Sequence, residues 1–440
     1  MEIWHRNNKK LAFFPETLNS FEINDYTNKI LTLLNFGATD GEIMKQTDSS
    51  KKEFEKVKKL FLKNKSEHLK PDNLINVRPN YLRRLSINIS NTCNMKCKYC
   101  YAKFGSYGSE ESMMNLNILK VTLDKFYNAF DEIGVLQVFG GEPFLNIKGF
   151  QYICEYIEKR YREGKIKYKT LITTVTNGTV LSSKILDLIK TYDICVTVSL
   201  DGPKSVQNEN RIFLNGTGTF GEVVHNINWM KRETGQPKQI EMTYSQTHVN
   251  NHVSILDLIK YVKNEFNNVS IHVAPVSADK KEDFALKNRN AFISSVDNVF
   301  QYNHIHRDKL NYLVLDSMIR SLEFPQKKTN FCDAGVDLFS VSCTGYIYPC
   351  YMFIGEPGFA LMNVQDKDFS RSVLLRKTQK YRDYNRQTKE CNKCPIVNVC
   401  EGCIGMNYYA TGNIYKSPNE ECNMKRKMVK NIMFNVVNVV

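Results

Sequence analysis

Three cysteines within eight residues are the first feature of this sequence that could do chemistry. The stretch "CNMKCKYC" places Cys93, Cys97 and Cys100 at the spacing C-x3-C-x2-C, in a chain of 440 residues with 13 cysteines. A zinc site or a simple iron–sulfur cluster ordinarily takes four protein ligands. Three thiolates on one loop therefore suit an iron–sulfur cluster with one iron left open, the alternative being a zinc site completed by a distant histidine. No histidine lies near the run, which favours the cluster.

A second concentration of cysteines lies from about residue 330 onward. It holds eight of the 13: Cys332, Cys343, Cys350, Cys391, Cys394, Cys400, Cys403 and Cys422. Strand patterns are weak in this segment, apart from a hairpin expected around Gly345 in "FSVSCTGYIYPC". Because a loop-rich segment buries little core of its own, metal ligation would offset the entropy lost when it folds. We expect the remaining two, Cys154 in a helical pattern and Cys195 at the start of a strand, to be ordinary buried cysteines.

Composition and charge are those of a globular protein with a basic balance. Hydrophobic residues make up 42% and charged residues 24% of the chain. No run of about 18 apolar residues predicts a membrane span, and the first residues lack a signal-peptide pattern. We therefore expect a cytoplasmic protein without a membrane partner, where clustered cysteines more often bind metal than form disulfides. The formal charge of +14 permits a nucleic acid or an acidic peptide as partner, but the basic residues are scattered, so nucleic acid is not favoured.

Strand and helix patterns alternate regularly between residues 84 and 277. The expected strands are 84–90, 135–143, 170–178, 194–202, 240–247 and 269–277, with a helical pattern in each gap. This alternation predicts an α/β fold in which crossover helices join parallel strands, a partial (β/α)6 TIM-like barrel over residues 80–325. In such a barrel the functional residues lie where strands end. The cysteine run, "GGEP", "TNG" and "SLDG" all fall at such ends.

The first 75 residues predict a separate small domain. "LAFFP" and "SFEIND" are typical of two short strands separated by a turn. Three short helices follow, and capping boxes open two of them, Thr39 with Glu42 and Ser50 with Glu53. Two strands and three helices predict a winged-helix-like domain over residues 1–75. Many domains of this outline bind DNA.

Together these motifs resemble the radical S-adenosylmethionine (radical SAM) superfamily. "CNMKCKYC" matches its cluster motif, with an aromatic residue before the third cysteine. The resemblance implies a catalytic [4Fe-4S] cluster on the three cysteines and S-adenosylmethionine at the open iron. It implies that "GGEP" meets the methionine amino group, and that "TNGT" and "SLDGP" lie near the ribose and the carboxylate. Arg211 would bind the carboxylate through its guanidinium fork. The expected cofactor-binding residues are Tyr99, Gly140, Gly141, Glu142, Pro143, Thr176, Asn177, Ser199, Asp201 and Arg211.

The C-terminal cysteines, over residues 326–440, resemble the SPASM extension of the same superfamily, which holds auxiliary iron–sulfur clusters. The usual core is C-x2-C-x5-C-x3-C, and this chain is one residue shorter in the last gap. The resemblance implies two auxiliary clusters, one on Cys391, Cys394, Cys400 and Cys422 and the other on Cys332, Cys350 and Cys403. Cys343 is either a fourth ligand of the latter cluster or a free thiol, and we favour the free thiol.

The resemblance implies an enzyme that abstracts hydrogen from a peptide carbon. The N-terminal outline is similar to the recognition element of enzymes that modify ribosomally made peptides, in which the precursor's leader adds a strand to a sheet edge. We therefore predict a maturase that forms a thioether at a cysteine of a precursor peptide. An external electron donor of the flavodoxin or ferredoxin type would supply this enzyme with electrons.

Three alternatives stay open. One is the anaerobic sulfatase-maturing type, which makes formylglycine and whose members carry an acidic base where this chain has Tyr351. Another is a different peptide cross-link. The third is a regulator that binds DNA through its winged helix and senses through an iron–sulfur cluster, but a sensor needs no S-adenosylmethionine pocket. The sequence identifies no catalytic base and no radical relay.

Overall fold

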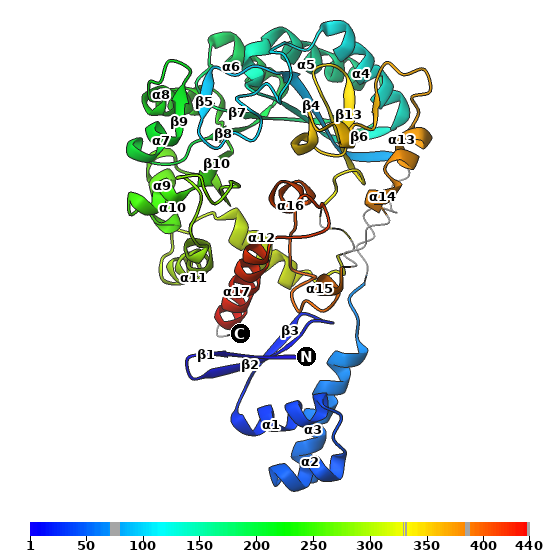
Figure 1. Cartoon of the computed structure of the whole chain (residues 1–440), viewed down its shortest axis with the longest axis vertical. Helices are drawn as coiled ribbons and strands as arrows, with labels where there is room; N and C mark the ends of the chain where they lie inside the picture. Colours follow the sequence, from blue (N-terminus) through cyan, green and yellow to red (C-terminus); the bar gives the residue numbers. More distant parts are fainter. Residues whose placement is uncertain (71–79, 329, 331, 383–387, 438–440) are drawn as a thin grey trace.

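Six parallel strands form the centre of the molecule (Figure 1). The computed structural model describes the chain except residues 71–79, 329, 331, 383–387 and 438–440. The strands are β4 (Tyr81–Ser90), β6 (Glu132–Gly140), β7 (Leu171–Thr176), β8 (Cys195–Ser199), β10 (Gln239–Tyr244) and β11 (Ser270–Pro275). They lie in the order β11-β10-β8-β7-β6-β4. All six strands expected from the sequence are present, which confirms the α/β fold class.

Helices connect these strands and cover one face of the sheet. They are α4 (Leu116–Ala129), α5 (Ile147–Arg162), α6 (Ser183–Tyr192), α7 (Lys204–Asn210), α8 (Phe220–Thr234), α9 (Gln246–Asn250), α10 (Ile255–Phe266), α11 (Asn290–Ile305) and α12 (Leu313–Glu323). Figure 1 shows most of them on the outer side of the curved sheet. Along β6 the buried side chains of Leu136 and Val138 alternate with those of Gln137 and Phe139. Because alternate residues of a strand face opposite sides, Gln137 and Phe139 lie on the inner face, away from the helices.

The C-terminal segment extends the same sheet. β12 (Leu338–Val341) pairs in parallel with β4, and β13 (Tyr346–Tyr348) and β14 (Met362–Asn363) continue it with antiparallel pairs. The hairpin expected around Gly345 is confirmed, and that glycine has a positive φ of 85°. The sequence did not predict that β12 would join β4. Weak, short strands carry no local signal for a partner that lies some 250 positions earlier in the chain.

The C-terminal segment is more helical than the sequence predicted. After the 3-10 turns η3 (Tyr351–Phe353) and η4 (Pro357–Phe359) come α13 (Arg371–Lys377), α14 (Gln379–Arg382), α15 (Lys389–Asn392), α16 (Ile404–Thr411) and α17 (Asn419–Val436). The 18-residue α17 buries Met424, Met428 and Ile432 at helical spacing. Its flanking residues give no side-chain cap, which is why the loop-rich expectation missed it.

The N-terminal residues form a three-stranded antiparallel sheet and three helices. The strands are β1 (Glu2–Arg6), β2 (Lys9–Phe14) and β3 (Asn19–Ile23), and the helices are α1 (Asp25–Asn35), α2 (Asp40–Thr47) and α3 (Lys51–Ser66). The sequence predicted two of these strands and missed β1, whose side chains are all at least partly exposed. Both capping boxes are confirmed at the starts of α2 and α3. β1 and β3 are the edges of this sheet.

One face of the N-terminal sheet packs on the C-terminal segment (Figure 1). The shared apolar cluster consists of Leu11, Phe13, Leu18, Ile396, Val399, Val429, Met433 and Phe434, with Cys394 and Cys400 packed against it. Arg6 Nη1 lies 3.0 Å from Asp297 Oδ1 on α11, and the same carboxylate accepts hydrogen bonds from Asn431 and Asn435 of α17. Within the described residues, no helix is long and apolar enough to cross a membrane.

Candidate functional site

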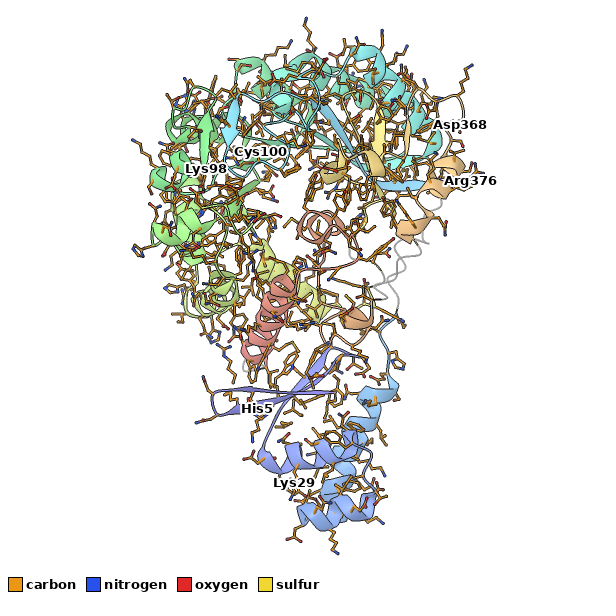
Figure 2. All side chains as sticks on the ribbon, in the orientation of Figure 1. His5, Lys29, Lys98, Cys100, Asp368 and Arg376 are labelled. Carbon is orange, nitrogen blue, oxygen red and sulfur yellow. The ribbon has the colours of Figure 1, made fainter. Side chains whose placement is uncertain are left out.

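The first cysteine run forms a loop held against a second strand. β4 ends at Ser90, and the short strand β5 (Met95–Cys97) pairs in antiparallel fashion with β9 (Arg211–Phe213), which brings Cys97 opposite Arg211. Figure 2 labels Lys98 and Cys100 on this loop. All three cysteines are partly buried free thiols. Burial raises the pKa of Cys93 to about 12 and that of Cys97 to about 11, so metal binding would have to displace their protons.

Asn177 and Asn94 tie the loop to the end of β7. Asn177 Nδ2 donates to Cys93 Sγ at 3.6 Å and to Asn94 Oδ1 at 2.9 Å, and Asn94 Nδ2 donates to Thr179 Oγ1 at 2.8 Å. The hydrogen-bond network therefore orients the cysteine loop against the end of β7. Asn94 lies between two candidate ligands in sequence, but sequence analysis missed its role because its partner is more than 80 positions away.

Glu142 links the "GGEP" segment to the "TNGT" segment through hydrogen bonds. Its carboxylate accepts hydrogen bonds from Thr176 Oγ1 at 2.8 Å, Asn177 N at 2.7 Å and Phe144 N at 3.1 Å. The side chain is fully buried, and burial raises the pKa of Glu142 to about 7 against the effect of these donors. The observed contacts of its carboxylate are thus with the protein, and the predicted contact of "GGEP" with a methionine amino group stays a prediction.

The two glycines of "GGEP" allow the end of β6 to approach the backbone of the cysteine loop closely. A Cβ on Gly141 would lie 2.3 Å from Thr92 O, in the cysteine loop itself. Gly140 O accepts from Tyr107 Oη at 3.3 Å, and Pro143 opens the short 3-10 helix η2 (Pro143–Asn146). These residues bring the end of β6 against the cysteine loop.

Tyr99, Asp201 and Arg211 form a buried polar group beside Cys97. Tyr99 Oη donates to Asp201 and accepts from Arg211 Nη1 at 3.2 Å. Asp201 also accepts from Thr243 N at 3.1 Å and from Asn210 Nδ2 at 3.3 Å. Burial, together with the charge of Asp201, holds the pKa of Tyr99 well above its usual range.

Arg211 fits the role predicted for it. Its side chain is buried, and its Nε has no hydrogen-bond partner among the described residues. An orphaned guanidinium donor in a buried site suits an anionic ligand such as a carboxylate. Ser199 lies at the end of β8, where it is the register partner of Glu241 on β10.

The C-terminal cysteines fall into two groups. Cys350 has Cys403 and Cys332 as electrostatic neighbours, and burial followed by these two thiols raises its pKa. Cys422 has Cys400 and Cys391 as neighbours, with burial again the main cause of its raised pKa. Arg426 lies beside Cys394, and the contact with this cysteine raises the pKa of the guanidinium. These groupings support the predicted ligand sets but do not test them.

Within the described part of the chain, no three Cys, His, Asp or Glu side chains converge on one point as ligands of a single ion would. A [4Fe-4S] cluster is bound differently, because each thiolate takes its own iron and the ligands surround the cluster. The donor chemistry of all three cysteine groups fits that kind of cofactor.

The other three cysteines lie apart from these groups. Cys343 is buried and its Sγ donates to Asn88 O at 3.0 Å, inside the main hydrophobic core, which supports the free thiol. Burial raises its pKa to about 12. Cys154 is fully buried as expected, whereas Cys195 is only partly buried.

A cavity of about 1220 Å³ joins the two cysteine regions. Its wall includes Tyr101, next to Cys100, and His272 on the inner face of β11. On the other side it includes Met352, Cys400, Cys403 and Cys422. The cavity thus reaches from Tyr101, the residue after the first cysteine run, to cysteines of both C-terminal groups, a relation that no sequence spacing could have shown.

Comparison with known proteins identifies the sheet region. The sequence model of the Radical SAM superfamily matches residues 87–272. The cysteine-type anaerobic sulfatase-maturating enzyme of Clostridium perfringens is 23% identical over 71% of this chain and 86% of its own length. The antilisterial bacteriocin subtilosin biosynthesis protein AlbA of Bacillus subtilis is 25% identical over 75% of this chain and 69% of its own.

Solved structures share the fold. Native anSMEcpe with bound AdoMet aligns with a TM-score of 0.68 at 19% identity, over 81% of this chain and 98% of that one. Streptococcus suis SuiB bound to its precursor peptide SuiA aligns with a TM-score of 0.56 at 16% identity, over 94% of this chain and 96% of that one. The second alignment covers more of this chain, with a lower TM-score.

Proposed function

We propose that this chain, whose residues 87–272 belong to the radical SAM superfamily, matures a ribosomally made precursor peptide by forming a thioether at a cysteine. The observation that carries the proposal is a cavity of about 1220 Å³ whose wall includes Tyr101, next to Cys100, and cysteines of both C-terminal groups. A peptide lying in it would meet a radical source and an electron acceptor at once.

The family implies a [4Fe-4S] cluster and S-adenosylmethionine, which when bound supply a carbon radical able to abstract hydrogen. Cys93, Cys97 and Cys100 would hold the cluster. Arg211 would bind the methionine carboxylate through its unpartnered Nε. The hydrogen bonds around Asn177 and Glu142 hold the loop to the strand ends, and fixed polar groups of this kind lower the reorganisation needed for reaction.

The C-terminal groups would hold two auxiliary clusters. Cys391, Cys394, Cys400 and Cys422 offer four thiolates, and Cys332, Cys350 and Cys403 offer three. With Cys343 buried in the core, the three-thiolate cluster would keep one iron without a protein ligand. An open position of this kind suits a peptide sulfur.

The N-terminal sheet would bind the leader of the precursor. β3 is an edge strand, and an extended peptide can add to such an edge through main-chain hydrogen bonds. The neighbouring α3 carries seven lysines and two glutamates in 16 residues, so an acidic leader matches its charge. SuiB, whose fold this chain shares, has a precursor peptide bound in its solved structure.

The sulfatase-maturing reaction is the second candidate. Its support is the similarity to the Clostridium perfringens enzyme. Against it stand the N-terminal domain and the tyrosine at the position where relatives of that type carry an acidic base. A DNA-binding regulator has no comparable support, since the buried network around Arg211 and Asp201 serves no purpose in a sensor.

Co-expression with a small cysteine-rich precursor peptide that carries an acidic leader tests the function. Mass spectrometry should find a loss of two hydrogens per link, and the link should survive reduction and alkylation, which a disulfide would not. The Cys97→Ala variant is the control and should leave the peptide unchanged. A product that has lost sulfur would instead identify formylglycine chemistry, and an unmodified peptide would contradict the proposal.

A further inference from the structure

Glu241 and His272 form a pair on the inner face of the sheet. They are register partners on the adjacent parallel strands β10 and β11, so their side chains project from the same face. Glu241 Oε1 lies 3.4 Å from His272 Nδ1, and each side chain is 38% exposed. Both residues are thus paired with each other and still open to the space in front of the sheet.

The pair lies at the cavity between the cysteine regions. His272 is part of the cavity wall together with Tyr101 and Cys403. Glu241 is an electrostatic neighbour of Tyr351, as are Cys350 and Cys403. The carboxylate and two cysteines of the three-cysteine group are therefore all near the Tyr351 phenol.

The orientation of the imidazole suits proton uptake from the cavity. A carboxylate beside Nδ1 favours the tautomer with its proton on that nitrogen, which leaves the lone pair of Nε2 to accept a proton. The separation of 3.4 Å is long for a hydrogen bond, and such bonds commonly tighten only once substrate is bound.

Three glutamates of the cavity wall are already paired with cations. Glu421 lies 2.9 Å from Arg289, Glu420 contacts Lys280, and Glu401 lies 3.6 Å from Lys328. A carboxylate held by a cation is a weak base. Glu241 differs from these three glutamates because its partner is a histidine, itself a proton acceptor.

We propose that Glu241 and His272 are the proton acceptor for the peptide thiol in thioether formation, with Nε2 of His272 taking the proton and Glu241 stabilising the resulting imidazolium. This inference rests on the proposed function. Thioether formation removes one hydrogen atom from carbon and one proton from sulfur, and it releases one electron as the carbon–sulfur bond forms. The hydrogen atom goes to the radical derived from S-adenosylmethionine and the proton to His272. The electron goes to a one-electron acceptor of the iron–sulfur class.

The test compares His272→Gln and Glu241→Gln with His225→Gln, a control histidine on the exposed face of α8. The substrate is the same cysteine-rich precursor peptide, and cross-linked product is measured beside 5′-deoxyadenosine formed without peptide. His272→Gln should slow cross-linking by about 10²-fold or more, the usual contribution of a general base, and Glu241→Gln by less. Peptide-independent 5′-deoxyadenosine formation should stay at the wild-type rate in all three variants.

A selenocysteine form of the same peptide separates proton transfer from simple positioning. A selenol ionises near neutral pH without a base, so His272→Gln should regain most of its cross-linking rate with this substrate. Loss of 5′-deoxyadenosine formation in Glu241→Gln would instead assign the carboxylate to cofactor binding and overturn the proposal. Wild-type cross-linking rates in both variants, or no selenocysteine rescue, would also overturn it. If the wild-type protein cross-links nothing, the proposed function itself fails.

Discussion

The two cysteine regions are built in opposite ways. The first has its three thiols on one loop of eight residues, and Asn177 and the β5–β9 pair hold that loop to strand ends. The C-terminal groups draw their thiols from segments far apart in sequence, joined by short helices and turns. The first region is therefore organised by the sheet, whereas we expect the second to depend on its cofactors for order.

The largest effect expected from this comparison is at Cys97. Cys97→Ala removes one of only three candidate ligands of the first cluster, so 5′-deoxyadenosine formation by reduced, reconstituted protein should fall by more than the 10- to 100-fold that loss of an outer partner causes. The loop should keep its fold, because its contacts to β7 and β9 do not involve this sulfur atom. An unaltered circular dichroism spectrum with lost activity is the expected result, and retained activity would refute the radical-enzyme assignment.

The second prediction separates the two C-terminal groups. Wild-type protein should bind about twelve irons, and Cys391→Ala and Cys403→Ala should each bind about eight, with about four in the double variant. Thermal unfolding should move to lower temperature in each variant, because these segments have little core of their own. Cleavage of S-adenosylmethionine in the absence of peptide should persist in these variants. Equal iron in the single and double variants would mean that one cluster uses both cysteines.

The third prediction concerns the N-terminal domain that packs against the second group. Lys56, Lys59 and Lys63 are exposed on α3, and replacing all three with glutamate should weaken binding of an acidic leader by about tenfold at low salt. Fluorescence anisotropy of the labelled precursor measures the affinity, and 5′-deoxyadenosine formation without peptide should not change.

A triple charge reversal elsewhere controls for net charge. Lys148, Lys184 and Lys190 are exposed lysines on α5 and α6, far from the N-terminal sheet in sequence. Their replacement by glutamate should leave precursor affinity unchanged. Equal weakening in both triple variants would show that overall charge, and not α3, attracts the peptide.

The smallest effect is expected at Cys343. Its thiol donates to a core carbonyl, and its raised pKa comes from burial and not from another cysteine. The Cys343→Ala variant should therefore retain the full iron content. Loss of one weak hydrogen bond and a little packing should lower the free energy of unfolding by about 1 kcal/mol. Loss of four irons would show that Cys343 is a ligand, and the cluster on Cys332, Cys350 and Cys403 would then have no open iron.

Much of the sheet could be predicted because its signals are local. Six apolar strands alternating with amphipathic helices gave the fold class and the order of the motifs, and the capping boxes of α2 and α3 were readable from four residues each. β1 and α17 were missed because exposed side chains and an uncapped start leave little local pattern.

The sequence by itself determined which residues can do chemistry: three cysteines on one loop, eight more at the C-terminus, and the motifs at the strand ends. Only the tertiary structure decided which of them meet. The pairing of β12 with β4 carries the segment of Cys350 to the inner face of the sheet, and the register of β10 and β11 sets Glu241 beside His272. Such contacts join residues far apart in the chain, and their register depends on packing of the whole sheet, so no spacing in the sequence encodes them locally.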